Sequence, residues 1–289
     1  IKKNLNIIIE DGVAYISDNF GYLYALDYEQ DNILWAKNYK VPFRSNLKIS
    51  GEKIIVSNQN NSLFFINKKN GNMIKLIPTE ESVVKNQFKN NLSLNDNSLF
   101  FLNTYGSLYS IDIETMRVKW FINLNQSLNL DSNNIFSGST VINFKNKIAV
   151  SSNNSTYIID ATNGSVLNTF NFSSRVKPII FENFYLAITK NDLLVAIDLE
   201  KAKIIYSYDI NEKISKFLNI KKKKAEFKNI FIGNNYIFIV LENSFYLKFN
   251  ITGDLEDIQK LPRKISSEII VAEGKILFIN SRGRLTVVN

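Results

Sequence analysis

Short apolar segments alternate with polar turns along the whole chain, and one pattern recurs seven times. Each copy consists of a small or polar turn, an alternating apolar strand and a closing Asp or Asn. The copies are residues 21–27, 61–67, 106–112, 154–160, 192–198, 243–250 and 283–289. Their closing residues lie 40, 45, 48, 38, 52 and 39 residues apart. Such spacing is typical of β-propellers, in which each repeat forms a blade of four short strands.

The other strands of a repeat can be placed around this motif. In the second repeat, apolar runs at 46–49 and 53–58 precede it, and the first repeat has an outer run at 33–39. The runs are rich in Ile, Val, Phe and Tyr and are cut by Asn-Gly, Asn-Asn and Asp-Gly pairs. Runs such as 236–241 are continuously apolar, which indicates sheets buried on both faces rather than a two-sheet sandwich. We predict an all-β propeller with little room for helix.

The predicted fold is a single propeller domain, 1–289. Its blade units lie at 5–39, 43–78, 90–123, 138–172, 177–209, 227–261 and 268–289. The seventh unit stops after three strands, and the residues before Leu5 are too few to supply a fourth. Because propellers commonly close with a strand from the other terminus, we expect residues upstream of Ile1 to complete this blade. The choice between seven and eight blades stays open.

Composition argues against most catalytic chemistry. The 289 residues include no cysteine and no histidine, which excludes a thiolate nucleophile, a Ser-His-Asp triad and imidazole or thiolate metal sites. Carboxylates cluster at 80–81 and 254–257, but without the apolar surroundings that raise a pKa for acid–base work. No calcium loop or phosphate-binding glycine loop occurs. We predict no catalytic residue, no cofactor, no metal and no enzymatic activity.

The net charge of +8 does not point to nucleic acid. The chain has 29 lysines and only six arginines, whereas readers of bases and phosphates favour the planar fork of arginine. The lysine run 221–224 indicates a solvated loop, with contact to acidic lipid headgroups or an acidic partner as the alternative. No apolar run reaches the ~18 residues of a membrane span.

Two sets of repeated residues have a structural interpretation. Asp27, Asp112, Asp160 and Asp198 each stand where a strand enters a turn, and Asp there binds its own backbone. Trp35 and Trp120 occupy matching positions on outer strands, which predicts packing between blades.

Three long connections between blades distinguish one face of the predicted propeller. They are 79–89, 124–137 and 210–226, and long insertions on one face usually mark a binding side. Their apolar residues include Phe88, Leu128, Leu130, Ile135, Phe136, Phe217, Leu218 and Ile220. These residues either fold back over the blade tops or form apolar anchors for a protein partner.

The string Gly21-Tyr-Leu-Tyr-Ala-Leu-Asp27, followed by Ile33-Leu-Trp35, resembles the repeat of quinoprotein-like (PQQ-repeat) propellers. In that group, quinone-cofactor dehydrogenases carry a catalytic aspartate, calcium ligands, often paired cysteines, and regular tryptophan docking motifs. This chain has two tryptophans, no cysteine, and Thr-x-Gly in the turn after a closing Asp only at 162–164. The dehydrogenase branch, or a ligand-binding propeller, is therefore kept as the alternative.

The chain is more similar to the BamB-like lipoproteins of the outer-membrane β-barrel assembly machinery. It ends on a third strand, it carries Ser-Leu-Asn-Leu-Asp at 127–131, and Arg175-Val-Lys-Pro178 precedes an apolar strand. The resemblance implies a non-catalytic scaffold with eight blades and a cleaved signal peptide. It also implies a lipid anchor on the periplasmic side of the outer membrane.

The resemblance further implies docking onto the periplasmic repeat domain of the central barrel protein. The expected partner-binding residues are Leu128, Leu130, Asp131, Ser173 and Arg175. The leucines match the apolar anchors of the family. Asp131 stands where the family has arginine, and Ser173 and Arg175 stand where it has aspartates, which indicates either a charge-swapped interface or a paralogue with another partner. Unfolded outer-membrane proteins are a further expected partner, held by β-augmentation.

Overall fold

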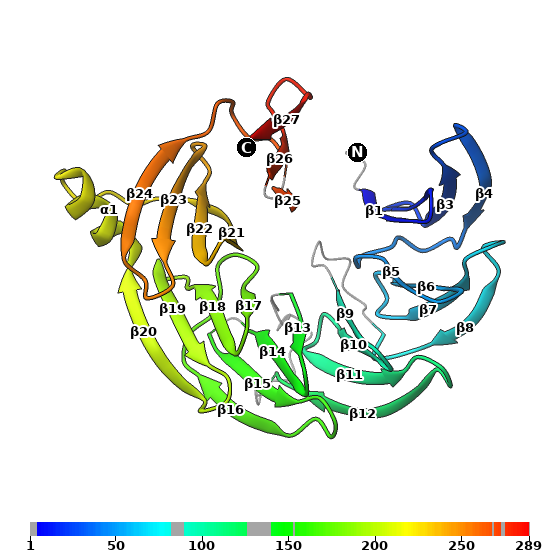
Figure 1. Ribbon diagram of the computed structural model, residues 1–289. Helices are drawn as coiled ribbons and strands as arrows, with labels where there is room; N and C mark the ends of the chain where they lie inside the picture. The colour runs from blue at the N-terminus through cyan, green and yellow to red at the C-terminus, as the bar shows by residue number, and fades with distance from the viewer. Residues whose placement is uncertain are drawn as a thin grey trace. The chain divides into compact units, whose positions relative to one another are not determined.

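A computed structural model describes residues 5–81, 90–125, 140–152, 154–267, 269–272 and 275–288. The chain divides into two compact units. The strands of both units are labelled in Figure 1. Unit 1 comprises Ile1–Asn153 and Tyr157–Thr169, and unit 2 comprises Asn154–Thr156 and Phe170–Asn289.

Unit 1 is built from four antiparallel sheets, in each of which the strands pair in chain order. The first sheet consists of β1 (Leu5–Glu10), β2 (Val13–Asp18), β3 (Tyr22–Asp27) and β4 (Asn32–Asn38). The second sheet consists of β5 (Lys48–Ser50), β6 (Lys53–Ser57), β7 (Leu63–Asn67) and β8 (Met73–Ile77). The third sheet consists of β9 (Asn91–Asn95), β10 (Ser98–Leu102), β11 (Ser107–Asp112) and β12 (Arg117–Asn123). The fourth sheet consists of β13 (Ile142–Phe144), β14 (Lys147–Ser151), β15 (Thr156–Asp160) and β16 (Val166–Phe170). Only the last sheet carries a few residues of unit 2.

Unit 2 repeats the arrangement in two four-stranded sheets and one three-stranded sheet. The first is β17 (Ile179–Phe181), β18 (Phe184–Ile188), β19 (Leu193–Asp198) and β20 (Lys203–Asp209), followed by helix α1 (Ile210–Leu218). The sixth sheet consists of β21 (Phe227–Gly233), β22 (Tyr236–Leu241), β23 (Phe245–Asn250) and β24 (Leu255–Lys260). The seventh sheet consists of β25 (Ile270–Ala272), β26 (Lys275–Ile279) and β27 (Leu285–Val288). The all-β fold built from blade-like sheets is thus confirmed. In the described residues the seventh sheet has three strands, as expected.

The second and third strands of the second to fifth sheets are almost wholly buried, whereas β27 of the last sheet alternates exposed and half-buried residues. In β10, residues 99–102 are each at most 1% exposed. One apolar cluster joins Ile55 and Phe65 of the second sheet to Phe101 and Ile111 of the third. Continuous apolar runs, rather than strict alternation, are what such doubly covered strands require.

The repeated aspartates bind the backbone of the turns that they begin, as predicted. The backbone N–H groups of Glu29, Thr115, Thr162 and Glu200 donate to the carboxylates of Asp27, Asp112, Asp160 and Asp198 at 3.0, 2.7, 2.7 and 2.8 Å. The N–H of Thr115 contributes most to lowering the pKa of Asp112. These carboxylates therefore shape turns between the third and fourth strands.

Tryptophans on fourth strands pack against glycines of the next sheet, which confirms the predicted role of Trp35 and Trp120 between blades. A Cβ added to Gly71 or Gly164 would lie 2.7 or 2.6 Å from the facing indole ring. Trp120 Nε1 donates to the carbonyl of Ala161 at 3.1 Å. In unit 2 the rings of Tyr206 and Tyr208 cover Gly253 in the same manner.

Helix α1 was not expected, because the sequence pattern assigns 210–226 to a loop. Its start is fixed by Asp209, whose side chain accepts from the N–H of Glu212, and its end by Asn219 in the left-handed conformation, with φ of 51°. The nine residues form the beginning of the connection from β20 to β21.

Candidate partner-binding face

At one end of its strands, each sheet has two kinds of loop that lie beside each other. This end of the strands is here called the connection edge of the sheet. Because the strands are antiparallel and pair in order, the turn between the second and third strands lies beside the connection that leaves the fourth. In unit 2, this edge of the β17–β20 sheet includes the turn 189–192 and the connection 210–226. The connection 171–178, which enters this sheet, reaches the same edge through the bridge between Ser174 and Thr189.

The structure places two of the five expected partner-binding residues. Ser173 and Arg175 lie on the connection from β16 to β17, within unit 2. Leu128, Leu130 and Asp131 lie outside the described residues. The same is true of Phe88, Ile135 and Phe136.

Ser173 is only 6% exposed, and its carbonyl accepts from the N–H of Lys190 at 3.0 Å. This bond ties the connection to the turn 189–192. Ser173 therefore holds the backbone in place, and its side chain offers a partner almost no surface.

Arg175 is neutralised by carboxylates from two other segments. Its Nη1 donates to Asp192 Oδ1 at 2.6 Å, and its Nη2 donates to Glu226. The guanidinium also lies 5.7 Å from the ring of Phe227. The arginine side chain is 23% exposed and that of Asp192 only 10%, so this pair is sheltered from solvent. One cation and two carboxylates leave the cluster with a formal charge of −1.

Asn211 extends this network into helix α1. Its Nδ2 donates to Asp192 Oδ2 at 3.0 Å, and its Oδ1 accepts from the N–H of Ala225 at 2.8 Å. Arg175 and Asn211 thus link the incoming connection, the 189–192 turn, the helix and the start of β21. Glu226, whose side chain is 57% exposed, is the accessible member of the cluster.

The end of α1 carries exposed apolar side chains. Phe217, Leu218 and Ile220 are 45, 45 and 49% exposed. The lysine run follows directly, and within it Lys222 pairs with Asp209 at 2.5 Å. Burial of Asp209 favours its neutral form, but Lys222 and the helix N–H groups outweigh this and lower its pKa. An apolar surface beside lysines can contact a protein or a membrane surface.

Glu80 performs a similar bracing role in unit 1. Its carboxylate accepts from Asn103 Nδ2 at 2.5 Å, from Ser107 Oγ at 2.7 Å and from the hydroxyl of Tyr109 at 3.1 Å. Burial first, and then Glu80, raise the pKa of Tyr109. The glutamate therefore fixes the connection leaving β8 to the turn of the next sheet. Among the described residues, no group of three or more acidic side chains could hold a metal ion.

The partners of Arg175 could not be found from sequence. Asp192 and Glu226 lie 17 and 51 residues away, in turns that differ in length from repeat to repeat. Only the register of the folded sheets brings them together.

Repeated four-stranded sheets in chain order, with aromatic rings on glycines of the next sheet, define a β-propeller of the PQQ-repeat class. The model of the family "Outer membrane protein assembly factor BamB" matches residues 7–208. The chain therefore belongs to the BamB family. A comparison with curated proteins finds no significant sequence match.

Two solved structures illustrate the likeness in fold. BamB from Moraxella catarrhalis superposes with a TM-score of 0.75 at 17% identity, covering 98% of this chain and 81% of that one. The computationally designed Ika8 protein gives a TM-score of 0.53 at 9% identity, covering 99% and 96%. The described residues contain no helix long and apolar enough to cross a membrane.

Proposed function

We propose that this protein is a non-catalytic scaffold of the outer-membrane β-barrel assembly machinery. In this proposal it is lipid-anchored on the periplasmic side of the outer membrane. The observation that carries the proposal is membership of the BamB family across residues 7–208. The described connection edges support it, because they present exposed apolar and charged side chains that are suited to binding a partner.

The proposed docking surface uses the long connections, with Leu128 and Leu130 as apolar anchors. Asp131, Ser173 and Arg175 complete it. Since Ser173 is buried and Arg175 is paired within the chain, these two act by fixing the shape of the connection. In this region the residue proposed to contact the partner directly is Glu226, the exposed carboxylate of the cluster. The expected partner is the periplasmic repeat domain of the central barrel protein.

A pull-down from detergent-solubilised envelopes of the source organism tests this function. The baits are the wild-type chain, a Leu128→Ala/Leu130→Ala variant and an Ile33→Ala/Leu34→Ala control. Ile33 and Leu34 are also exposed, at 60 and 50%, but lie on the fourth strand β4. Truncating apolar anchors at an interface typically weakens binding by ~2 kcal/mol or more.

The expected result is recovery of the barrel protein with wild type and control, and its loss with the Leu128/Leu130 variant. Recovery with all three baits would retain the function and reject the docking surface. Failure to recover the barrel protein with the wild-type bait would contradict the proposed function itself. Thermal unfolding of each bait separates loss of binding from loss of folding.

A further inference from the structure

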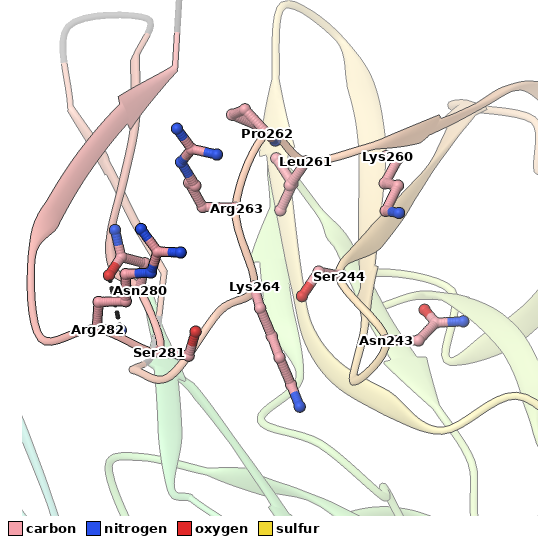
Figure 2. A pocket seen from close by; sticks show the side chains of 10 residues that line it. All are labelled: Asn243, Ser244, Lys260, Leu261, Pro262, Arg263, Lys264, Asn280, Ser281 and Arg282. Atoms are coloured by element: carbon pink, nitrogen blue, oxygen red, sulfur yellow. Dashed lines mark hydrogen bonds between the residues drawn. The ribbon is translucent and has the colours of Figure 1, made fainter.

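A basic pocket of about 420 Å³ lies at the connection edge of the last two sheets, wholly within unit 2 (Figure 2). Its walls come from the 243–244 turn, the connection 260–264 and the 280–282 turn. Four of the lining side chains are cationic: Lys260, Arg263, Lys264 and Arg282. Among the described residues, the lining contains no carboxylate.

Hydrogen bonds fix the backbone of this pocket. The N–H of Leu261 donates to the carbonyl of Ser244 at 2.9 Å, and the N–H of Ile265 donates to Ser244 Oγ at 3.0 Å. On the other side, the N–H of Ser281 donates to the carbonyl of Lys264 at 2.9 Å. The connection is thus held at both ends between two turns, so the pocket is a built feature rather than a loose loop.

The 280–282 turn is equally well ordered. Asn280 is 7% exposed, and its Oδ1 accepts from the N–H groups of Arg282 and Arg284 at 2.9 and 3.2 Å. Its Nδ2 donates to Thr286 at 3.0 Å. The turn therefore presents the Arg282 side chain from a fixed backbone.

The cations of the pocket are not neutralised within the part of the chain that the structure describes. None of the four makes an ion pair there, whereas Arg175 and Lys213 of the same unit do. Arginine is scarce in this protein, with six in all, yet three of the six lie between 263 and 284. Figure 2 shows Arg263 and Arg282 on one side of the connection and Lys260 on the other.

We infer that this pocket binds a phosphate-bearing anion. Four cationic residues line this one pocket, and a ligand with more than one negative charge gains most from the attraction of several cations. A phosphate monoester carries about −1.5 to −2 charges and three strong acceptor oxygens, whereas a carboxylate carries −1. Arginine's planar fork binds phosphate oxygens with two parallel hydrogen bonds. The hydroxyl of Ser281 and the amide of Asn243 supply neutral donors beside the cations.

Calorimetric titration with sodium pyrophosphate in a phosphate-free buffer tests the site. The full chain is compared with an Arg263→Gln/Arg282→Gln variant and with a Lys223→Gln/Lys224→Gln control. The control removes the same charge from another exposed connection of unit 2. Vesicles of phosphatidylglycerol with phosphatidylcholine, against phosphatidylcholine alone, form a second arm. Circular dichroism verifies that both variants fold.

If the ligand is a soluble phosphate compound, pyrophosphate should bind saturably and one-to-one. Its affinity should be roughly tenfold or more weaker in the arginine variant. The lysine control should stay within about twofold, because distant exposed charges are screened. Arginine-dependent binding to phosphatidylglycerol vesicles alone supports a lipid headgroup as the source of the phosphate.

Equal weakening in both variants, or no binding in either arm, would overturn the inference. A hexaglutamate peptide serves as a carboxylate probe in the same titration. Binding of this peptide but of neither phosphate probe would also overturn the inference and assign the pocket to acidic polypeptides. The inference goes beyond the proposed scaffold function and is read out independently of the barrel protein.

Discussion

Replacement of Gly164 by alanine tests whether stacking of a tryptophan on a glycine joins neighbouring sheets in unit 1. The new Cβ would lie 2.6 Å from Trp120 Cε3 and 2.8 Å from Cδ2. Residue 164 also has φ of 79°, a conformation that L side chains rarely adopt. Moving the indole away would break the 3.1 Å hydrogen bond from Trp120 Nε1 to Ala161.

The expected destabilisation can be worked out from these two effects. The positive φ costs roughly 1–2 kcal/mol for a non-glycine residue. Losing a part-buried hydrogen bond costs roughly 1–3 kcal/mol more, so Gly164→Ala should lower the unfolding free energy by roughly 2–5 kcal/mol. At Gly283, with φ of 73°, and at Gly51, with φ of 54°, an added Cβ would have no heavy atom within 4 Å. Alanine at either control position should therefore cost only the backbone part.

Urea unfolding followed by far-ultraviolet circular dichroism measures these differences. The set comprises wild type, Gly164→Ala, Gly283→Ala, Gly51→Ala, Trp120→Ala and the Gly164→Ala/Trp120→Ala pair. With the indole removed, alanine at 164 should cost no more than at Gly51, because the clash is gone. If Gly164→Ala costs the same with and without Trp120, or no more than the controls, stacking does not hold these sheets together.

Three further predictions concern the ion pair of Arg175, the buried phenol of Tyr39 and the helix cap Asp209. Arg175→Ala leaves the sheltered carboxylate of Asp192 without its cation, and should lower the unfolding free energy in urea by roughly 1–3 kcal/mol; unchanged stability would contradict the bracing role. Burial raises the pKa of Tyr39 to about 12, so the neutral phenol is favoured in the folded state. Its stabilisation is present below about pH 10 and is lost as the pH rises towards 12; Tyr39→Phe should flatten this alkaline decline, and an equally steep decline would refute it. Asp209→Ala removes the helix cap, costing roughly 0.5–2 kcal/mol, seen as faster hydrogen exchange across 210–218 than in wild type. Because the pKa of Asp209 is lowered in the folded state, its advantage exists at neutral pH and fades as the pH falls below about 4; a variant with wild-type exchange at pH 7 would speak against the cap.

The short helix shows how far local patterns reach. Ile210, Ile214, Phe217 and Leu218 follow helical spacing, and Asp209 with Glu212 three residues later forms a start signal. The signal was present in the sequence. It was missed because nine residues between strands give too short a periodic run to outweigh the surrounding β-pattern.

The strands, the turns and the repeating sheet can be predicted from the amino-acid sequence alone. These follow from interactions between near neighbours: apolar runs at β-spacing, and aspartates such as Asp160 that bind a backbone N–H two residues on. The sequence also predicts that Trp35 and Trp120 occupy equivalent positions, since the repeat itself shows this. The continuous burial of β10 was readable for the same reason.

Which charged side chains form ion pairs, and which do not, depends on the folded arrangement of the loops. Arg175 pairs with Asp192 and Glu226 because three loops meet at one connection edge, whereas Arg263 and Arg282 line a pocket together with Lys260 and Lys264. In the sequence all three arginines lie in polar segments between predicted strands, and nothing there tells which of them has an acidic partner. The physical reason is that pairing depends on distances of a few ångströms between residues far apart in the chain, and loop lengths that vary between repeats set those distances.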